Sequence, residues 1–246
     1  MIGRPNVSAE EIGTLIEKDQ VLSAKVLRLA NSPFYGFPSR IASVAHAVVV
    51  LGLNVVKGLT LCATAFDMMR YAGMNELWRH SLGVAITAHI LGTKAAMKNP
   101  EEVFVAGLLH DIGKVVLYVK WPDVGQQITT VTRNTSRPLM DTEQELFEVT
   151  HADVGGWLAS AWHLPTSLRE PILHHHTPAA AQDAKLQTAI VHVADVLVKG
   201  LACGNPGDDL VPPLSRQAWD LVGLDAQSLA HCLTQATEEF QTIDDY

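Results

Sequence analysis

The chain reads Ala106-Gly-Leu-Leu-His-Asp-Ile-Gly-Lys114 near its middle, an apolar run interrupted by an adjacent imidazole and carboxylate. A charge in an apolar interior is costly unless it is paired or bound to a metal. We therefore expect His110 and Asp111 to be carried by a buried helix and to emerge from it into a pocket. The alternative is a hydrogen-bonded His–Asp pair at a helix end, the commoner role of such a dipeptide.

Lys114 follows Asp111 by three residues, so helical geometry brings the two side chains to nearly the same side. A cation in that position can hold a substrate phosphate or act as a general acid. The alternative is a surface lysine near the helix end, because lysine side chains are usually exposed.

Other parts of the chain offer the same types of ligand: His80, His151, the run His174-His175-His176, and Asp195. A single histidine on an apolar face is more often a satisfied core residue than a ligand. Several separate predicted helices, however, each offer a residue that can bind a metal, which favours a shared metal site. Imidazole and carboxylate ligands suit zinc, iron, manganese or nickel.

Two details of this set stay open. Consecutive helical residues point about 100° apart, so at most two of the histidines at 174–176 can face one pocket from a regular helix. Asp195 lies in an apolar run, where an unpaired carboxylate is hard to bury. His192 shares its helix face, so a His192–Asp195 hydrogen bond is the alternative to metal binding, and a supporting role around the ligands is also open.

Helix signals dominate the rest of the chain, and strand-like alternation is nearly absent. Ser8 and Glu11 form a capping box. Asp19 can cap a helix that should end before Pro33, and residues 34–40 are predicted to form a loop. A further helix begins at Asn99 and carries the His–Asp pair. We expect the remaining helices at about 43–51, 54–70, 75–97, 122–133, 141–147, 151–162, 167–175, 184–203, 216–222 and 226–240.

The composition excludes several functions. The net charge is -8, from 18 basic and 26 acidic residues, which argues against nucleic-acid binding through phosphates. The 3 cysteines are far apart, which favours a reducing, cytoplasmic environment over a disulfide framework. The start lacks a signal-peptide core. The longest apolar stretch, residues 43–66, is interrupted by polar residues and glycines, so it predicts two buried helices and no membrane span.

The order His80, His110-Asp111, Asp195 resembles the signature of the HD superfamily of metal-dependent phosphohydrolases. More closely, the chain resembles the HDOD branch, an output domain of bacterial signalling proteins. Three stretches carry that resemblance: residues 29–34 (LANSPF); residues 41–48 followed by Leu51-Gly52; and residues 151–155 leading to 162–165 and 175–178. It implies an all-α, two-lobed HDOD architecture with an HD-superfamily helical core. We place the boundary at Tyr71-Ala72-Gly73, between an N-terminal lobe (1–73) and a metal-binding lobe (74–246).

The resemblance also implies a metal site. The chain is similar to the HD-GYP phosphodiesterases in keeping a nearly full ligand set. By that similarity Asp111 bridges two transition-metal ions, with one set of ligands completing each site: His80, His110 and Asp195 for the first, and His151, His175 and His176 for the second. Lys114 matches the lysine of the HDIGK motif. The glutamate that follows the histidine pair and the Gly-Tyr-Pro loop are absent, which weakens the case for cyclic di-GMP hydrolysis.

Two functions follow as expectations. The first is a signal-transduction output domain, which works with a signalling protein partner or an upstream sensor or receiver domain. The second is a metal-dependent phosphohydrolase acting on a nucleotide or another phosphoester, with Asp111 and Lys114 as its catalytic residues. The acidic charge and the lack of a basic amphipathic helix leave little support for a nucleic-acid or membrane module.

Overall fold

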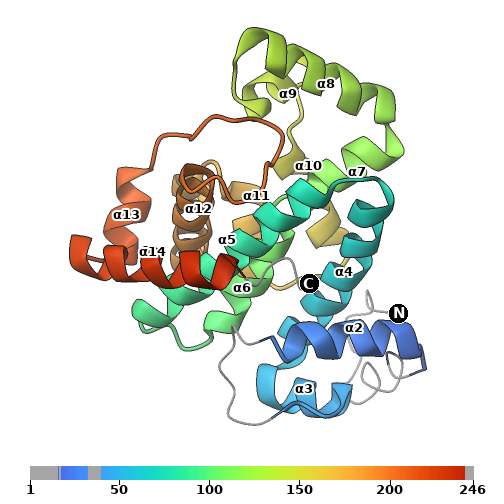
Figure 1. Ribbon diagram of the computed structural model, residues 1–246, viewed down its shortest axis with the longest axis vertical. Coiled ribbons are helices and arrows are strands. Elements are labelled where there is room, and N and C mark those ends of the chain that lie inside the picture. The colour runs from blue at the N-terminus through green and yellow to red at the C-terminus, as the bar shows by residue number, and fades with distance from the viewer. Residues whose placement is uncertain (1–15, 17, 33–39, 242–246) are drawn as a thin grey trace.

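The computed structural model describes Ile16, residues 18–32 and residues 40–241, and this part of the chain is helical without a strand (Figure 1). The predicted capping box at Ser8–Glu11 and nearly all of the predicted loop at 34–40 lie outside the described residues. The elements run in the order α2 (Gln20–Ala30), α3 (Val44–Leu51), α4 (Leu53–Tyr71), α5 (Asn75–Lys94), α6 (Pro100–Leu109), α7 (Ile112–Lys120), α8 (Pro122–Thr135), α9 (Leu139–Phe147), α10 (His151–Ala161), α11 (Thr166–His174), the 3-10 turn η2 (Pro178–Ala180), α12 (Lys185–Gly200), α13 (Arg216–Val222) and α14 (Ala226–Phe240).

Local capping signals place the helix ends well. Asp19 caps α2 by accepting hydrogen bonds from the backbone N–H groups of Val21 and Leu22, each at 3.0 Å. The helices α13 and α14 have the predicted bounds, and side-chain caps from Ser215 and Asp225 open them. Each of these signals acts within one turn, so it can be recognised without knowing the tertiary structure.

One predicted element is wrong. The sequence predicts a single helix carrying both His110 and Asp111, but α6 ends at Leu109 and α7 starts at Ile112. Asp111 departs from helical geometry, with φ −98° and ψ 13°. Because neighbouring residues of an unbroken helix point about 100° apart, a continuous helix would aim only one of these two side chains at a common site.

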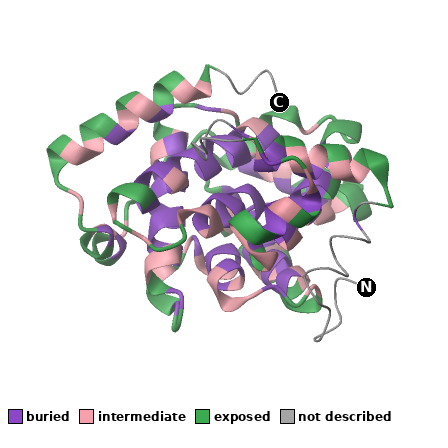
Figure 2. Ribbon diagram, turned by 90° about the horizontal axis from the view of Figure 1, so that it is seen from below, coloured by how far each residue is buried: buried purple, intermediate pink, exposed green. Residues whose placement is uncertain are grey.

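The interior of the molecule is built on α5, α6 and α12, and Figure 2 shows the buried residues concentrated in the central helices. α5 is buried on almost every side, because α6, α12 and α14 all pack against it. α4 connects the N-terminal helices to this centre by contacting α2, α6 and α5. Its Phe66 ring lies 4.5 Å, between centroids, from the Trp78 ring of α5. α8 and α9 form the end of the molecule opposite α2 and α3 (Figure 1).

The apolar stretch at 43–66 forms α3 and most of α4, as predicted. None of the described helices combines the length and the apolar character needed to cross a membrane.

Gly113 allows α7 to approach the start of α10 closely. A Cβ atom on this residue would lie 1.9 Å from the carbonyl oxygen of His151 and 2.9 Å from the backbone nitrogen of Gly155. Both neighbours are backbone atoms, so a side chain could be accommodated only if the two helices moved apart.

We therefore predict that Gly113→Ala lowers the free energy of unfolding by about 1–3 kcal/mol or prevents folding. Gly200→Ala is the matched control, because a Cβ atom at the end of α12 meets no atom within 4 Å among the described residues. The control should change stability by about 1 kcal/mol or less, in the stabilising direction. Urea unfolding followed by circular dichroism measures both, and equal stability of the two variants would contradict the proposed helix contact.

Candidate metal centre

The predicted ligands come together in the interior from separate elements. His80 lies on α5, His110 and Asp111 form the junction between α6 and α7, and His151 is the first residue of α10. The remaining members follow α11 or lie on α12: His175, His176 and Asp195. All are buried except His176, which is partly exposed.

These side chains form three overlapping groups that could hold a metal ion. The groups are His80 with His110 and Asp195; His151 with His175 and His176; and His110 with Asp111 and His175. Within each group one ligand atom per residue lies within 4.8 Å of the others. His174, the last residue of α11, belongs to none of them. The helix ends there, which frees His175 and His176 from the 100° spacing of a regular helix.

Asp111 lies between the two halves of the cluster. Its Oδ2 is 3.3 Å from Nε2 of His110 and 4.0 Å from Nε2 of His80. Its Oδ1 is 3.2 Å from Nε2 of His151 and 3.8 Å from Nε2 of His175. Each carboxylate oxygen thus faces a different set of histidines, which is the arrangement that a bridging ligand requires.

The outer nitrogens of three histidines contact oxygen atoms that can only accept a hydrogen bond. Nδ1 of His110 donates to the Gly107 carbonyl at 2.7 Å, and Nδ1 of His175 donates to the Ile172 carbonyl at 2.9 Å. Nδ1 of His151 lies 2.6 Å from the carboxylate of Glu143. A proton held on Nδ1 leaves the lone pair of a neutral imidazole on Nε2, the atom that faces the cluster. Metal-binding histidines are held in this way.

Glu143 on α9 is a buried carboxylate that sequence reasoning missed. It contacts the His151 ring and also accepts the His151 backbone N–H at 2.9 Å. Its neighbours Gln144 and Glu145 are exposed, as is usual for such residues, so no local pattern marks Glu143 as different. Only the tertiary contact between α9 and the start of α10 reveals its role.

His192 lies next to the cluster and contacts its backbone. The predicted alternative, a His192–Asp195 hydrogen bond, is not formed; Nδ1 of His192 donates instead to the His175 carbonyl at 2.7 Å, and its Nε2 accepts the Ser215 backbone N–H at 3.0 Å. Asp195 Oδ1 lies 3.0 Å from Nε2 of His80. The three-residue spacing identified a helix face correctly, but the two side chains on it have different partners.

Lys114 is buried, so it is not a surface lysine, and its Nζ donates to Asp111 Oδ2 at 2.7 Å. Burial alone would raise the pKa of Asp111, but the charges of His110 and Lys114 hold it well below its ordinary value. Burial lowers the pKa of His176 to about 3. Burial and the neighbouring histidines also lower the pKa of His175 well below its ordinary value. Neighbouring carboxylates act in the opposite direction on two other members: despite burial, Asp111 raises the pKa of His110, and Glu143 raises the pKa of His151.

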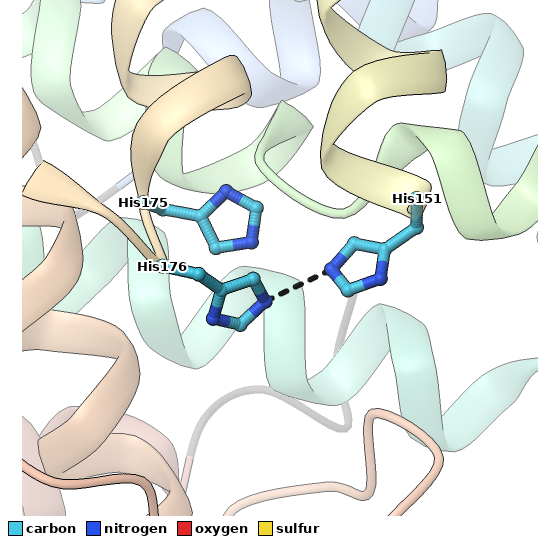
Figure 3. Close-up of side chains that lie close together, drawn as sticks. All are labelled: His151, His175 and His176. Atoms are coloured by element: carbon cyan, nitrogen blue, oxygen red, sulfur yellow. Dashed lines mark hydrogen bonds between the residues drawn. The ribbon is translucent and has the colours of Figure 1, made fainter. Parts of the chain in front are cut away.

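Several ligand atoms are buried without a well-aligned hydrogen bond among the described residues: Nε2 of His80, His110 and His175, and Oδ1 of Asp111. Figure 3 shows the His151 and His176 rings meeting through Nε2 atoms 3.0 Å apart, with the His175 ring beside them. Nitrogens that share one ion at about 2.0–2.1 Å lie roughly 3 Å apart. The residues present therefore fit a metal ion.

Fold and cluster together define an all-helical protein with a histidine–aspartate centre of the HD type. A model of the HDOD domain matches residues 1–178, and the chain belongs to the HDOD family.

Two solved structures share the fold, and a third relative is similar in sequence. An HDOD domain protein of unknown function from Geobacter sulfurreducens is 28% identical with a TM-score of 0.75, and the match covers 99% of this chain and 88% of that one. A provisionally named phosphohydrolase from Shewanella amazonensis SB2B has a TM-score of 0.68 at 24% identity, over 98% of this chain and 88% of its own. An uncharacterized protein of Treponema pallidum (strain Nichols) is 26% identical over 85% of this chain. The match spans only 42% of that relative's length.

The contacts of Glu143 generate a prediction about stability. Glu143→Gln removes a buried charge that holds both the ring and the backbone of His151, so we expect the free energy of unfolding to fall by about 1.5–3 kcal/mol. Glu145→Gln is the control, two residues away on the same helix but exposed and ion-paired only with Arg137. Glu145→Gln should lower the free energy of unfolding by less than about 1 kcal/mol. Both are measured by urea unfolding in the presence of a chelator, and equal losses would show that the Glu143 contacts contribute nothing specific.

Proposed function

We propose that this HDOD protein is a signalling output module whose core holds two divalent transition-metal ions, with Asp111 as the bridging ligand. One observation carries the proposal: the two oxygens of Asp111 face two separate sets of histidines. The first ion would be held by His80, His110 and Asp195, and the second by His151, His175 and His176.

The donor set limits the choice of metal. It consists of imidazole nitrogens and carboxylate oxygens, and none of the candidate groups among the described residues contains a cysteine. Such donors suit iron, manganese, zinc or nickel better than calcium or magnesium, which prefer oxygen ligands throughout.

The family supports the signalling role, because the HDOD branch is known as an output domain of bacterial signalling proteins. The Treponema pallidum relative is more than twice as long as the matched region, which fits a module that works beside other domains. We propose that a sensor or receiver domain, in the same or another chain, controls this one.

The second candidate function is phosphoester hydrolysis, and Lys114 favours it. This buried cation touches Asp111 and also lines a cavity of about 580 Å³. Bound metal ions would supply an activated water and stabilise the charge on a phosphoryl group. Asp111 would hold the ions in place, and the Lys114 ammonium would orient a phosphate oxygen or donate a proton to the leaving group.

Metal content tests the main proposal. Protein purified without chelator or affinity tag should contain about two transition-metal atoms per chain, and Asp111→Ala should lose them, because each ion would lose its shared ligand. Asp220→Ala, an exposed residue of α13, is the control and should keep the wild-type content. Elemental analysis by mass spectrometry gives the number. A wild-type chain that takes up no iron, manganese or zinc would sink the proposal.

Lys114→Met tests the second function. It keeps the side-chain length but removes the charge, so hydrolysis of bis(p-nitrophenyl) phosphate should fall by about 100-fold while the metal content stays. Lys120→Met, exposed at the end of the same helix, should retain the wild-type rate. If the metal-loaded wild-type protein is inactive on this and other phosphoesters, the hydrolase reading fails and the signalling module stands.

A further inference from the structure

A cavity of about 190 Å³ lies between α2, α4 and the start of α5. It is separate from the larger cavity that Lys114 lines, because no residue lines both. None of the candidate metal ligands lines it either. An inference about its ligand is therefore independent of the metal centre and goes beyond the proposed function.

Apolar and aromatic side chains form the inner wall of this cavity. Leu29 of α2 and Ala63 of α4 are buried there. The Trp78 ring of α5 is also buried, and it lies against the partly buried Phe66 ring with 4.5 Å between the centroids. Because aromatic rings attract one another in tilted and offset arrangements, this pair favours a third ring beside it.

The outer wall is basic, although the whole chain has a net charge of -8. Its basic residues are Lys25, Arg28 and Arg70, and the one carboxylate among the residues that line the cavity is that of Asp67. Asp67 is ion-paired with Lys25, so the lining as a whole is positively charged. A negatively charged ligand is therefore favoured over a neutral or positive one.

Arg70 is the group placed to receive an anion. Its side chain is exposed near the end of α4, and its guanidinium forms no ion pair with a described residue. A guanidinium binds a carboxylate through two parallel N–H···O bonds, which fix the orientation of the anion as well as its position. An anion held there can direct the rest of the molecule toward the inner wall.

The volume selects among ligands that carry a negative charge. A cavity of about 150 Å³ encloses a benzene ring, whereas pockets for larger organic molecules measure about 300–1,000 Å³. A nucleotide is therefore too large for this cavity. An inorganic anion fits, but it would leave the apolar inner wall without a partner. A single ring that bears a carboxylate matches the volume, the aromatic pair and the charge together.

We propose that this cavity binds a small aromatic carboxylate, with its ring against Phe66 and Trp78 and its carboxylate on the Arg70 guanidinium. The ligand would contact three helices at once, where α2 and α4 meet the start of α5 (Figure 1).

Ligand-observed NMR titration of the full chain, which detects weak binding, tests the proposal with four probes: benzoate, benzamide, cyclohexanecarboxylate and acetate. Benzoate should bind at least about 10-fold more tightly than benzamide, because hydrogen bonds to a charged group are stronger than neutral ones. It should exceed acetate by about the same factor, because acetate covers none of the apolar wall. Cyclohexanecarboxylate has the apolar volume without an aromatic face, so it should bind about 2- to 10-fold less tightly than benzoate.

Two variants locate the binding and a third is the control. Arg70→Gln should weaken benzoate binding by about 10-fold and leave benzamide binding unchanged, because only the charged probe uses the guanidinium. Phe66→Leu keeps an apolar side chain but removes the ring, so it should narrow the preference for benzoate over cyclohexanecarboxylate. Arg133→Gln, at an exposed arginine of α8, should bind all probes as the wild type does. Thermal unfolding checks that each variant is folded.

The proposal is overturned if benzoate does not bind, or if benzamide or cyclohexanecarboxylate binds as tightly as benzoate. It is also overturned if Arg70→Gln binds benzoate as the wild type does, or if Arg133→Gln weakens the binding as much as Arg70→Gln. None of these results changes the expected metal content of the chain, so the cavity and the metal centre succeed or fail separately.

Discussion

The rest of the structure depends on keeping the carboxylate of Asp111 ionised inside an apolar core. A buried carboxylate is tolerated only with opposite charges or metal ions around it. Here Lys114 donates to one oxygen, and histidines from other helices approach both. Five helical elements have to converge for this, and the apolar packing of α5, α6 and α12 fixes where they meet. The core and the site are therefore one arrangement.

The helices could be predicted from the sequence because their signals are local, as the caps at Asp19 and Asp225 show. The break at His110–Asp111 could not. The apolar pattern continues across it, and the cause is the position of other helices around the two side chains. Glu143 and the true partner of His192 were missed for the same reason, since both contacts join different elements. The candidate ligand residues were predicted from their order along the chain, and the structure brings their side chains together.

Relatives with about a quarter of their residues in common keep this fold almost throughout its length. Fold alone does not assign function, which depends on the particular side chains in the site. In this chain the groups that contact the outer nitrogens of the candidate ligands say most about the site. Glu143 and the carbonyls of Gly107 and Ile172 set the orientation of three imidazoles, and they would do so with or without a bound ion.

The close approach of Gly113 to His151 joins the two halves of the site by main-chain atoms. This contact sets how closely α7 and α10 approach, whichever side chains lie at the site. A lineage could replace His151 or His175 and keep the same scaffold, because α7 and α10 would still be seated against each other. The chemistry of such a domain can be lost one side chain at a time while its shape remains available for binding other proteins.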